Sequence, residues 1–250
     1  MWQAGNFAAV AEKILEAGEL VVDRAGVEPG MKVLDVACGT GNATLPAARA
    51  GARATGLDFA PGLLAIARER AADAMVEIDF LEGDAQELPF DDASFDRVVS
   101  TFGHMFAPDH RRTADEMRRV LRPDGAIAVA CWTPEGSIGR MSERIAEVVP
   151  PPPGGEPPLL WGGEEHVREL WGPGVRFERH AIEWIDDSVE SYARFMLDSF
   201  GPLLNARERL AEREDELERA YVEYLRQENE AADGTLRFRG EYLLAVVQPA

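Results

Sequence analysis

Cysteine is scarce in this sequence, and its histidines follow no ligand pattern. Only Cys38 and Cys131 occur among 250 residues, and the four histidines are scattered. Disulfide-stabilised domains and zinc-binding domains depend on regularly spaced cysteines or histidines. We therefore expect two reduced, buried thiols, with a disulfide as the less favoured alternative, a cytoplasmic location and no metal site. His110 and His166 lie among charged residues and are expected to be exposed.

Positive charge is also in short supply. The chain has 26 Lys and Arg residues against 45 Asp and Glu, a formal net charge of −19, and Lys13 and Lys32 are its only lysines. A field of this sign repels phosphate backbones, so nucleic acid is excluded as the expected partner. No apolar run approaches the roughly 20 residues that cross a bilayer. Residues 1–10 lack the basic and apolar stretches of a signal peptide.

What the sequence does have is a regular alternation of apolar and helical segments. Hydrophobic residues make up 46% of the chain, enough for a substantial core. Short apolar segments predict strands at 32–37, 52–59, 76–84, 95–101 and 126–132. Helical periodicity and Pro61 predict helices at 6–25, 41–50, 61–73 and 109–121. This alternation indicates an α/β fold with a doubly wound parallel sheet that is covered on both faces.

The pattern changes after Trp132. The remaining segments predict helices at 137–148, 164–171, 188–199 and 203–231, and strands at 175–184 and 235–248. The expected division is a Rossmann-like core of residues 1–135 and 232–250, and an inserted, mainly helical segment of residues 136–231. One core strand near 175–184 lies within that segment. Its aromatic residues, such as Trp161, are candidates for a lid over an apolar pocket.

A glycine loop joins the first strand to a helix in VLDVACGTGNATL, residues 33–45. Such a loop exposes backbone N–H groups to a ligand. A P-loop is excluded, because Asn42 and Ala43 stand where it needs lysine and serine or threonine. A dinucleotide site is weakened but stays open, since Thr44 replaces the third glycine of that motif.

Three carboxylates indicate which ligand the loop holds. Asp35 lies in the first strand, four residues before Gly39; a carboxylate there would repel a pyrophosphate and hold an ammonium group. Asp58 ends the second strand, where a carboxylate binds ribose hydroxyls. Asp84 ends the third strand, where its carboxylate can accept a hydrogen bond from an adenine amine. An ammonium group, a ribose and an adenine along one edge describe S-adenosylmethionine.

With these features, the sequence resembles the class I S-adenosylmethionine-dependent methyltransferases. The branch is the small-molecule one that includes ubiquinone- and menaquinone-biosynthesis-like enzymes, methyltransferase type 11. The matching blocks, within residues 32–132, are VLDVACGTGNATL, ATGLDFAPGLLAIARERA, FLEGDAQELPFDDASFDRVVSTFGHMF and EMRRVLRPDGAIAVACW. Ala37 departs from the pattern, because the family often has glycine there. The resemblance implies a seven-stranded Rossmann-like sheet with its last strand antiparallel, S-adenosylmethionine as cofactor and S-adenosylhomocysteine as product.

The resemblance also implies a role for individual residues at the cofactor. At the methionine part, Asp35 would contact the amino group, and Ala37, Gly39 and Gly41 would line the chain. Asp58 would bind the ribose hydroxyls, and Thr101 would border the methyl donor. At the adenine, the implied contacts are Phe59, Asp84 and the Ala85 N–H, the last of these at its edge.

Methyl transfer from a sulfonium depends mainly on alignment and exclusion of water. His104 is the candidate general base if the acceptor must lose a proton. Trp132 either walls the acceptor pocket or fills the core, and Trp2 and Phe7 are candidates to close it from the N-terminal side. The expected partner is a small apolar or aromatic acceptor, and a homodimer is compatible with the sequence. The alternative function is a non-catalytic or regulatory protein that binds S-adenosylmethionine or a nucleoside.

Overall fold

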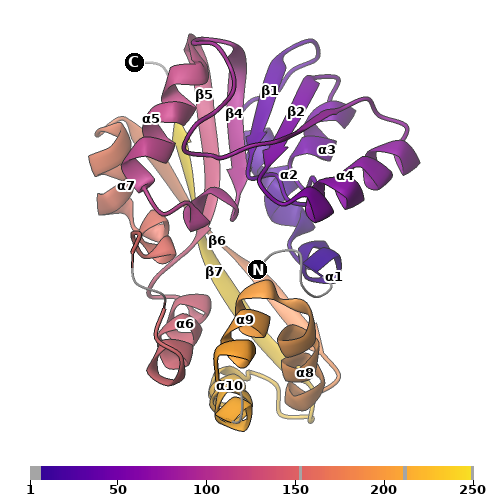
Figure 1. Ribbon diagram of the computed structural model, residues 1–250, viewed down its shortest axis with the longest axis vertical. Coiled ribbons are helices and arrows are strands. Elements are labelled where there is room, and N and C mark those ends of the chain that lie inside the picture. Colours follow the sequence, from indigo (N-terminus) through magenta and orange to yellow (C-terminus); the bar gives the residue numbers. More distant parts are fainter. Residues whose placement is uncertain (1–6, 152–153, 211–212, 249–250) are drawn as a thin grey trace.

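A seven-stranded sheet runs through the centre of the computed structural model, which describes residues 7–151, 154–210 and 213–248 (Figure 1). The strands lie in the order β3-β2-β1-β4-β5-β7-β6. Strands β1 to β5 are parallel to one another, whereas β7 is antiparallel to both β5 and β6. The expected doubly wound sheet with an antiparallel last strand is therefore confirmed. In chain order, the strands are β1 (Lys32–Val36), β2 (Arg53–Asp58), β3 (Asp79–Glu82), β4 (Phe95–Thr101), β5 (Leu121–Trp132), β6 (Val175–Asp186) and β7 (Leu236–Val247).

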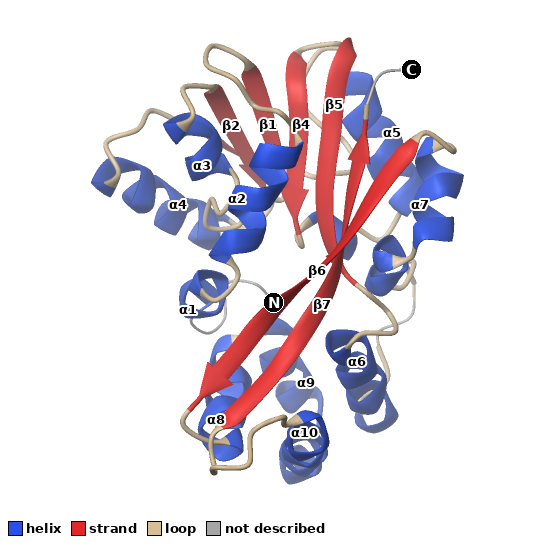
Figure 2. Ribbon diagram, turned by 180° about the vertical axis from the view of Figure 1, so that it is seen from behind, coloured by secondary structure: helices blue, strands red, loops and turns tan. Residues whose placement is uncertain are grey.

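Helices cover both faces of this sheet. Figures 1 and 2 show α2 and α3 on one face and α5 on the other. The α-helices are α1 (Phe7–Glu12), α2 (Leu15–Arg24), α3 (Thr44–Arg49), α4 (Pro61–Asp73), α5 (His110–Val120), α6 (Ser137–Val148), α7 (Glu164–Trp171), α8 (Val189–Ser199), α9 (Gly201–Leu210) and α10 (Glu214–Glu228). Two short 3-10 helices are η1 (His104–Phe106) and η2 (Pro158–Gly162). In the described part of the chain, no helix has the length and apolarity to cross a membrane.

The central position of β1 explains why its side chains are apolar. All of its residues after Lys32 are buried, because β2 and β4 flank it and helices cover it. Asp35 is the exception in polarity, and it pairs with Gly56 of β2 and Val99 of β4. The fold therefore places one carboxylate in the middle of the core, immediately before the glycine loop.

Two long strands extend beyond the parallel part of the sheet. Strands β6 and β7 pair along their full twelve residues, from Val175 with Val247 to Asp186 with Leu236. Figure 2 shows α8, α9 and α10 gathered around the far half of this ribbon, with α6 beside them. Tyr224 of α10 donates a hydrogen bond to the Ser137 carbonyl of α6. This group, α6 with α8 to α10, is the helical lobe. The carboxyl ends of β1, β2 and β4 point toward it (Figure 2).

Some expected elements are divided or shorter in the structure. The helix expected at 6–25 is α1 and α2, because i to i−3 bonds of Lys13 and Ile14 tighten the chain between them. The helix expected at 203–231 is α9 and α10. Strand β3 starts only at Asp79, because Met75 takes a left-handed φ of 54° and Val76 donates to the Ala71 carbonyl, which caps α4.

Candidate active site

The glycine loop between β1 and α3 bends through left-handed backbone conformations. The φ angles are 55° at Gly39 and 86° at Gly41. The φ of Gly41 would strain any other residue, and a Cβ there would also lie 2.5 Å from Leu45 Cδ1, which would have to move. Ala37 also has a left-handed φ of 54°, and Gly103 packs directly on its carbonyl, where a Cβ would lie 2.1 Å away. The loop is thus held open by glycines and by one strained alanine.

Asp35 presents an unsatisfied carboxylate oxygen at this loop. The residue is 1% exposed, and its Oδ2 accepts a 2.6 Å hydrogen bond from Thr44 Oγ1. No described residue bonds to its buried Oδ1. Burial raises the pKa of Asp35 to about 7, against the lowering effect of the Thr44 hydrogen bonds. A buried carboxylate without a partner for one oxygen is a site for a cationic group.

Asp58 is tied to the same loop from the end of β2. Its Oδ2 accepts a 2.8 Å bond from the Gly39 N–H, and its Oδ1 accepts a 2.8 Å bond from the Ala60 N–H. Burial raises the pKa of Asp58, and these amide hydrogen bonds act against that rise. Each carboxylate oxygen has a second lone pair, so the group can still accept hydroxyl donors. The next residue, Phe59, is 58% exposed and offers an open ring face.

The third acid lies on the loop after β3. Asp84 is exposed, and its Oδ1 accepts a 2.8 Å bond from the Gln86 N–H. Ala85 between them is buried. Gln86 in turn accepts a 3.1 Å bond from the Asp109 N–H at the start of α5. Asp84 is therefore held in a local turn that is itself attached to α5.

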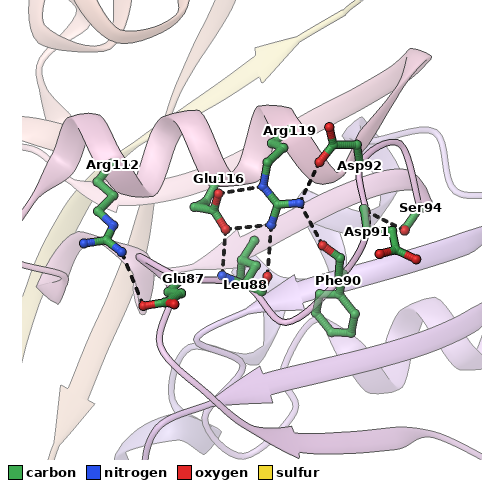
Figure 3. A network of polar contacts seen from close by, with 9 residues as sticks. All are labelled: Glu87, Leu88, Phe90, Asp91, Asp92, Ser94, Arg112, Glu116 and Arg119. Carbon is green, nitrogen blue, oxygen red and sulfur yellow. Dashed lines mark hydrogen bonds and ion pairs between the residues drawn. The ribbon is translucent and has the colours of Figure 1, made fainter.

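One arginine fixes the remainder of this loop against α5 (Figure 3). Arg119 donates to the Leu88 carbonyl at 2.9 Å, the Phe90 carbonyl at 2.7 Å and the Asp92 carboxylate at 2.9 Å. Glu116 aligns the guanidinium through a 2.6 Å bond and also accepts a 2.7 Å bond from the Leu88 N–H. The hydrogen bond to Glu116 raises the pKa of Arg119. The segment that carries Asp84 is thereby anchored at both ends.

The end of β4 borders the loop from the other side. Thr101 has a buried Oγ1 that finds no hydrogen-bond partner in the described part of the chain. Phe102 follows with a left-handed φ of 59° and stacks on Trp132, with ring centroids 4.0 Å apart and planes at 5°. Tyr242 packs edge-on against Phe102 at 5.5 Å. Trp132 is partly buried, so it packs in the core and also borders the edge next to Thr101.

The chain is similar to known methyltransferases and to uncharacterized bacterial proteins. A methyltransferase domain family matches residues 33–125. The uncharacterized protein Rv1405c of Mycobacterium tuberculosis is 38% identical over 257 aligned residues, which cover 99% of this chain and 92% of that protein. The demethylmenaquinone methyltransferase of Renibacterium salmoninarum is 45% identical over 111 residues, which cover 44% of this chain and 45% of that one.

A solved structure shares the whole fold. It is a putative methyltransferase from Bacillus halodurans, with a TM-score of 0.63 and 19% identity over 93% of this chain and 98% of that one. The chain belongs to the class I S-adenosylmethionine-dependent methyltransferases. The resemblance read from residues 32–132 is confirmed by these matches.

His104 of the methyltransferase lies in the interior and not at the acceptor edge. Its side chain is 0% exposed, with Nδ1 3.0 Å from Ser100 Oγ and Nε2 3.3 Å from Cys131 Sγ. Trp161 packs edge-on against the ring at 4.6 Å. Burial lowers the pKa of His104 to about 3. The geometry corrects the view that this ring faces an acceptor, because both ring nitrogens point at core residues.

His110 and His166 are not exposed as expected. The His110 side chain is 0% exposed and that of His166 is 15% exposed, and their rings meet beside Trp161. Trp161 itself is 1% exposed and contacts Trp171 at 5.2 Å between centroids. It is therefore a core residue and not part of a mobile lid. Their charged sequence neighbours predicted exposed side chains. In the structure, α5 and α7 turn these two histidines toward each other and away from solvent.

Two supporting residues of the glycine loop were missed in the sequence. Thr44 orients Asp35 through its hydroxyl. In the sequence, this residue served only as evidence against a dinucleotide-binding motif. Arg70 of α4 donates to the Thr40 carbonyl at 2.6 Å and to Asn42 Oδ1 at 2.9 Å, which fixes the outer side of the loop. The sequence signal for Thr44 is its place at the start of α3, shortly after a strand that carries a buried aspartate.

The N-terminal helix α1 packs against the glycine loop near Gly39. A Cβ on Gly39 would lie 3.8 Å from Phe7 Cε1, and Phe7 stacks with Phe200 at 6.4 Å. Lys13 also lies over the Phe195 ring of α8 at 5.4 Å. Helix α1 thus connects the glycine loop to the helical lobe. Trp2, the other residue expected here, lies outside the described residues.

Proposed function

We propose that the carboxyl edge of β1, β2 and β4 binds S-adenosylmethionine. The observation that carries this proposal is the buried Oδ1 of Asp35, which has no partner among the described residues and lies where the cofactor's ammonium group is needed. Asp58 offers two oxygens for the ribose, and Phe59 an open face for the adenine. These features lie in the same order along the edge as the three parts of the cofactor.

The remaining contacts follow the same order. Ala37, Gly39 and Gly41 would line the methionine chain, because their backbone leaves no side-chain bulk in the loop. Asp84 and the Ala85 N–H would read the adenine edge from the anchored loop. Thr101, whose Oγ1 has no partner in the described part of the chain, would border the methyl group.

The acceptor we propose is a small apolar or aromatic molecule. It would lie between Thr101 and the helical lobe, where Trp132 and Phe200 supply aromatic surface. The inserted segment that we propose, residues 136–231, contains this lobe together with η2, α7 and the core strand β6. The net charge of −19 disfavours an anionic acceptor or a nucleic acid. Bound S-adenosylmethionine supplies a methyl group on a positive sulfur, which already makes it electrophilic.

The protein's own residues would contribute alignment and exclusion of water. Asp35, Asp58 and the anchored Asp84 loop would fix the donor at three points, and Phe7 would cover it from the N-terminal side. His104 is buried with both ring nitrogens against core residues, so proton removal by this ring is not part of the proposal. Turnover at saturating cofactor should therefore show no titration of an imidazole near neutral pH.

Calorimetric titration with S-adenosylhomocysteine tests the cofactor site. We expect binding to the wild type without added metal, and about tenfold or greater loss in Asp58→Ala, which removes charge-assisted hydrogen bonds of roughly 1.5–3 kcal/mol. Asp79→Ala, on the exposed start of β3, is the matched control and should bind normally. Binding of NAD with no response to S-adenosylhomocysteine would refute the site.

A panel of phenols, quinols, amines and polyketides then tests the acceptor class, with S-adenosylhomocysteine release as the signal. We expect turnover for apolar members. Tight cofactor binding with no turnover on any member, and turnover only on charged substrates, would each contradict the proposed acceptor class.

A further inference from the structure

Three side chains from separate parts of the chain converge away from the cofactor edge. His110 begins α5, Glu156 lies in the connector before η2, and His166 lies on α7. Nδ1 of His110 is 2.9 Å from Nε2 of His166 and 3.9 Å from Oε2 of Glu156. One ligand atom from each of the three residues lies within 4.8 Å of the others. Two imidazoles and a carboxylate at such distances are a set of metal-ligand donors.

The spacing suits a small tetrahedral ion. Zinc–nitrogen bonds of about 2.0–2.1 Å place two ligand atoms about 3.3 Å apart in a tetrahedron. The measured separations from His110 Nδ1, 2.9 Å and 3.9 Å, lie on either side of that value. Binding of the ion would require the side chains of His166 and Glu156 to bring both separations to that value.

Further contacts hold these residues in place. The Glu156 N–H donates to the Pro108 carbonyl at 2.9 Å, and Glu156 Oε2 accepts a 2.8 Å bond from the His110 N–H. The His110 ring packs on Trp161 at 5.4 Å. Glu169 Oε2 is 4.0 Å from Nδ1 of His166, so it adds a negative charge beside this imidazole without a hydrogen bond to it.

We propose that His110 Nδ1, His166 Nε2 and the Glu156 carboxylate bind one Zn²⁺ ion. The Glu156 side chain is 43% exposed, so the fourth position faces solvent and takes water. Without metal, the 2.9 Å contact between ring nitrogens is a hydrogen bond with one proton. Zinc takes the place of that proton between the two nitrogens, and the proton moves to the other nitrogen of its own ring, so both histidines bind as neutral imidazoles. The ion would tie the connector at Glu156 and α7 to the start of α5, and its role would be structural.

The sequence predicted no metal site because these ligands are 46 and 10 residues apart, a spacing found in no short zinc motif. The fold brings them together from three segments. This proposal does not depend on the cofactor site, since it uses residues that the cofactor edge does not contain.

Zinc titration of the chelator-treated full chain tests the site. We expect one Zn²⁺ per chain, with a higher melting temperature in zinc and four-coordinate d–d absorption when Co²⁺ replaces it. His166→Gln should lose more than about 100-fold in zinc affinity, above the range for an outer-shell partner. Glu156→Gln should weaken binding and leave the protein folded, because the amide oxygen can still accept from His110.

The matched control is His180→Gln. His180 also pairs with a glutamate, Glu178 at 3.1 Å, but no second histidine is its partner there. This variant should bind zinc as the wild type does. The proposal is overturned if the wild type binds no zinc at one ion per chain, or if His166→Gln binds it with unchanged affinity while its circular dichroism spectrum stays native.

Discussion

The substitution Asp35→Asn should make the unliganded protein more stable and the cofactor complex weaker. Asparagine has nearly the same shape as aspartate, and its side-chain oxygen can keep the 2.6 Å bond from Thr44 Oγ1. What it removes is a negative charge in a residue that is 1% exposed and has one oxygen without a partner among the described residues. The same charge that would hold an ammonium group is a cost to the empty protein.

The size of the stability gain in Asp35→Asn follows from the pKa of Asp35. Folding raises it from 3.8 to about 7, a shift of about three units, which corresponds to about 4 kcal/mol at pH well above 7. The new amide N–H₂ would be left without an acceptor, which costs about 1–3 kcal/mol. We therefore expect a net gain of about 1–3 kcal/mol at pH 8, or a rise in melting temperature of about 2–10 °C.

The sign of the pH dependence follows from the raised pKa. For the wild type without ligand, the protonated folded form is stable at low pH, and that contribution is lost as pH rises from about 4 through about 7. Cofactor affinity changes in the opposite direction, because only the ionised carboxylate attracts the ammonium group, so affinity should rise up to about pH 7 and then level off. Both trends should disappear in Asp35→Asn.

Thermal unfolding between pH 5 and 8, with and without S-adenosylhomocysteine, measures both effects. Asp96→Asn is the matched control, since this β4 carboxylate is also near the core but is paired. Burial would raise its pKa, but hydrogen bonds from Lys32 N–H and Arg122 lower it overall. It should destabilise the protein and leave cofactor affinity unchanged. A destabilised Asp35→Asn with full affinity would refute the reasoning.

Three further predictions concern the surroundings of the site. Arg119→Lys should lower stability by about 1–3 kcal/mol and raise the cofactor KM, because one ammonium nitrogen cannot replace five hydrogen bonds made from three guanidinium nitrogens. Arg112→Lys, whose 3.3 Å pair is exposed, should cost about 0–1 kcal/mol in urea unfolding. Ala37→Gly should change stability by less than about 1 kcal/mol, because relief of its left-handed φ offsets the added chain entropy, whereas Ala43→Gly should destabilise in the same assay. His104→Ala should lower the melting temperature through loss of buried contacts, without the roughly 10²–10⁴-fold fall in kcat of a lost general base; a fall of that size at saturating cofactor would restore His104 as the base.

The parallel half of the sheet was predictable because its signals are local. Residues 32–37, 52–59 and 95–101 are apolar and short, and the structure places strands within each range. The placement of Asp35 and Asp58 at one edge follows from parallel strands, whose carboxyl ends must meet. Burial of β1 on both faces then explains why Asp35 is the one charged residue among the last four of that strand.

The surroundings of the site were not predictable in the same way. His104 follows β4 directly, so its position in the sequence suggested an exposed edge, yet η1 turns the ring inward onto Ser100 and Cys131. His110 and His166 are 56 residues apart, and no periodicity relates them. Only the packing of α7 against α5 brings their rings together, and packing between distant segments leaves no short-range pattern in a sequence.

Departures from local structural preference gather at the carboxyl edge. Of the described non-glycine residues with a left-handed φ, Ala37 and Phe102 lie there, one after β1 and one just after β4. Asp35 adds a buried, half-satisfied charge, and Thr101 adds a buried hydroxyl without a described partner. Each costs folding free energy, and the apolar strands behind them offset that cost. A core alone would not favour such a combination, whereas a site that must present charge and backbone to a ligand requires it.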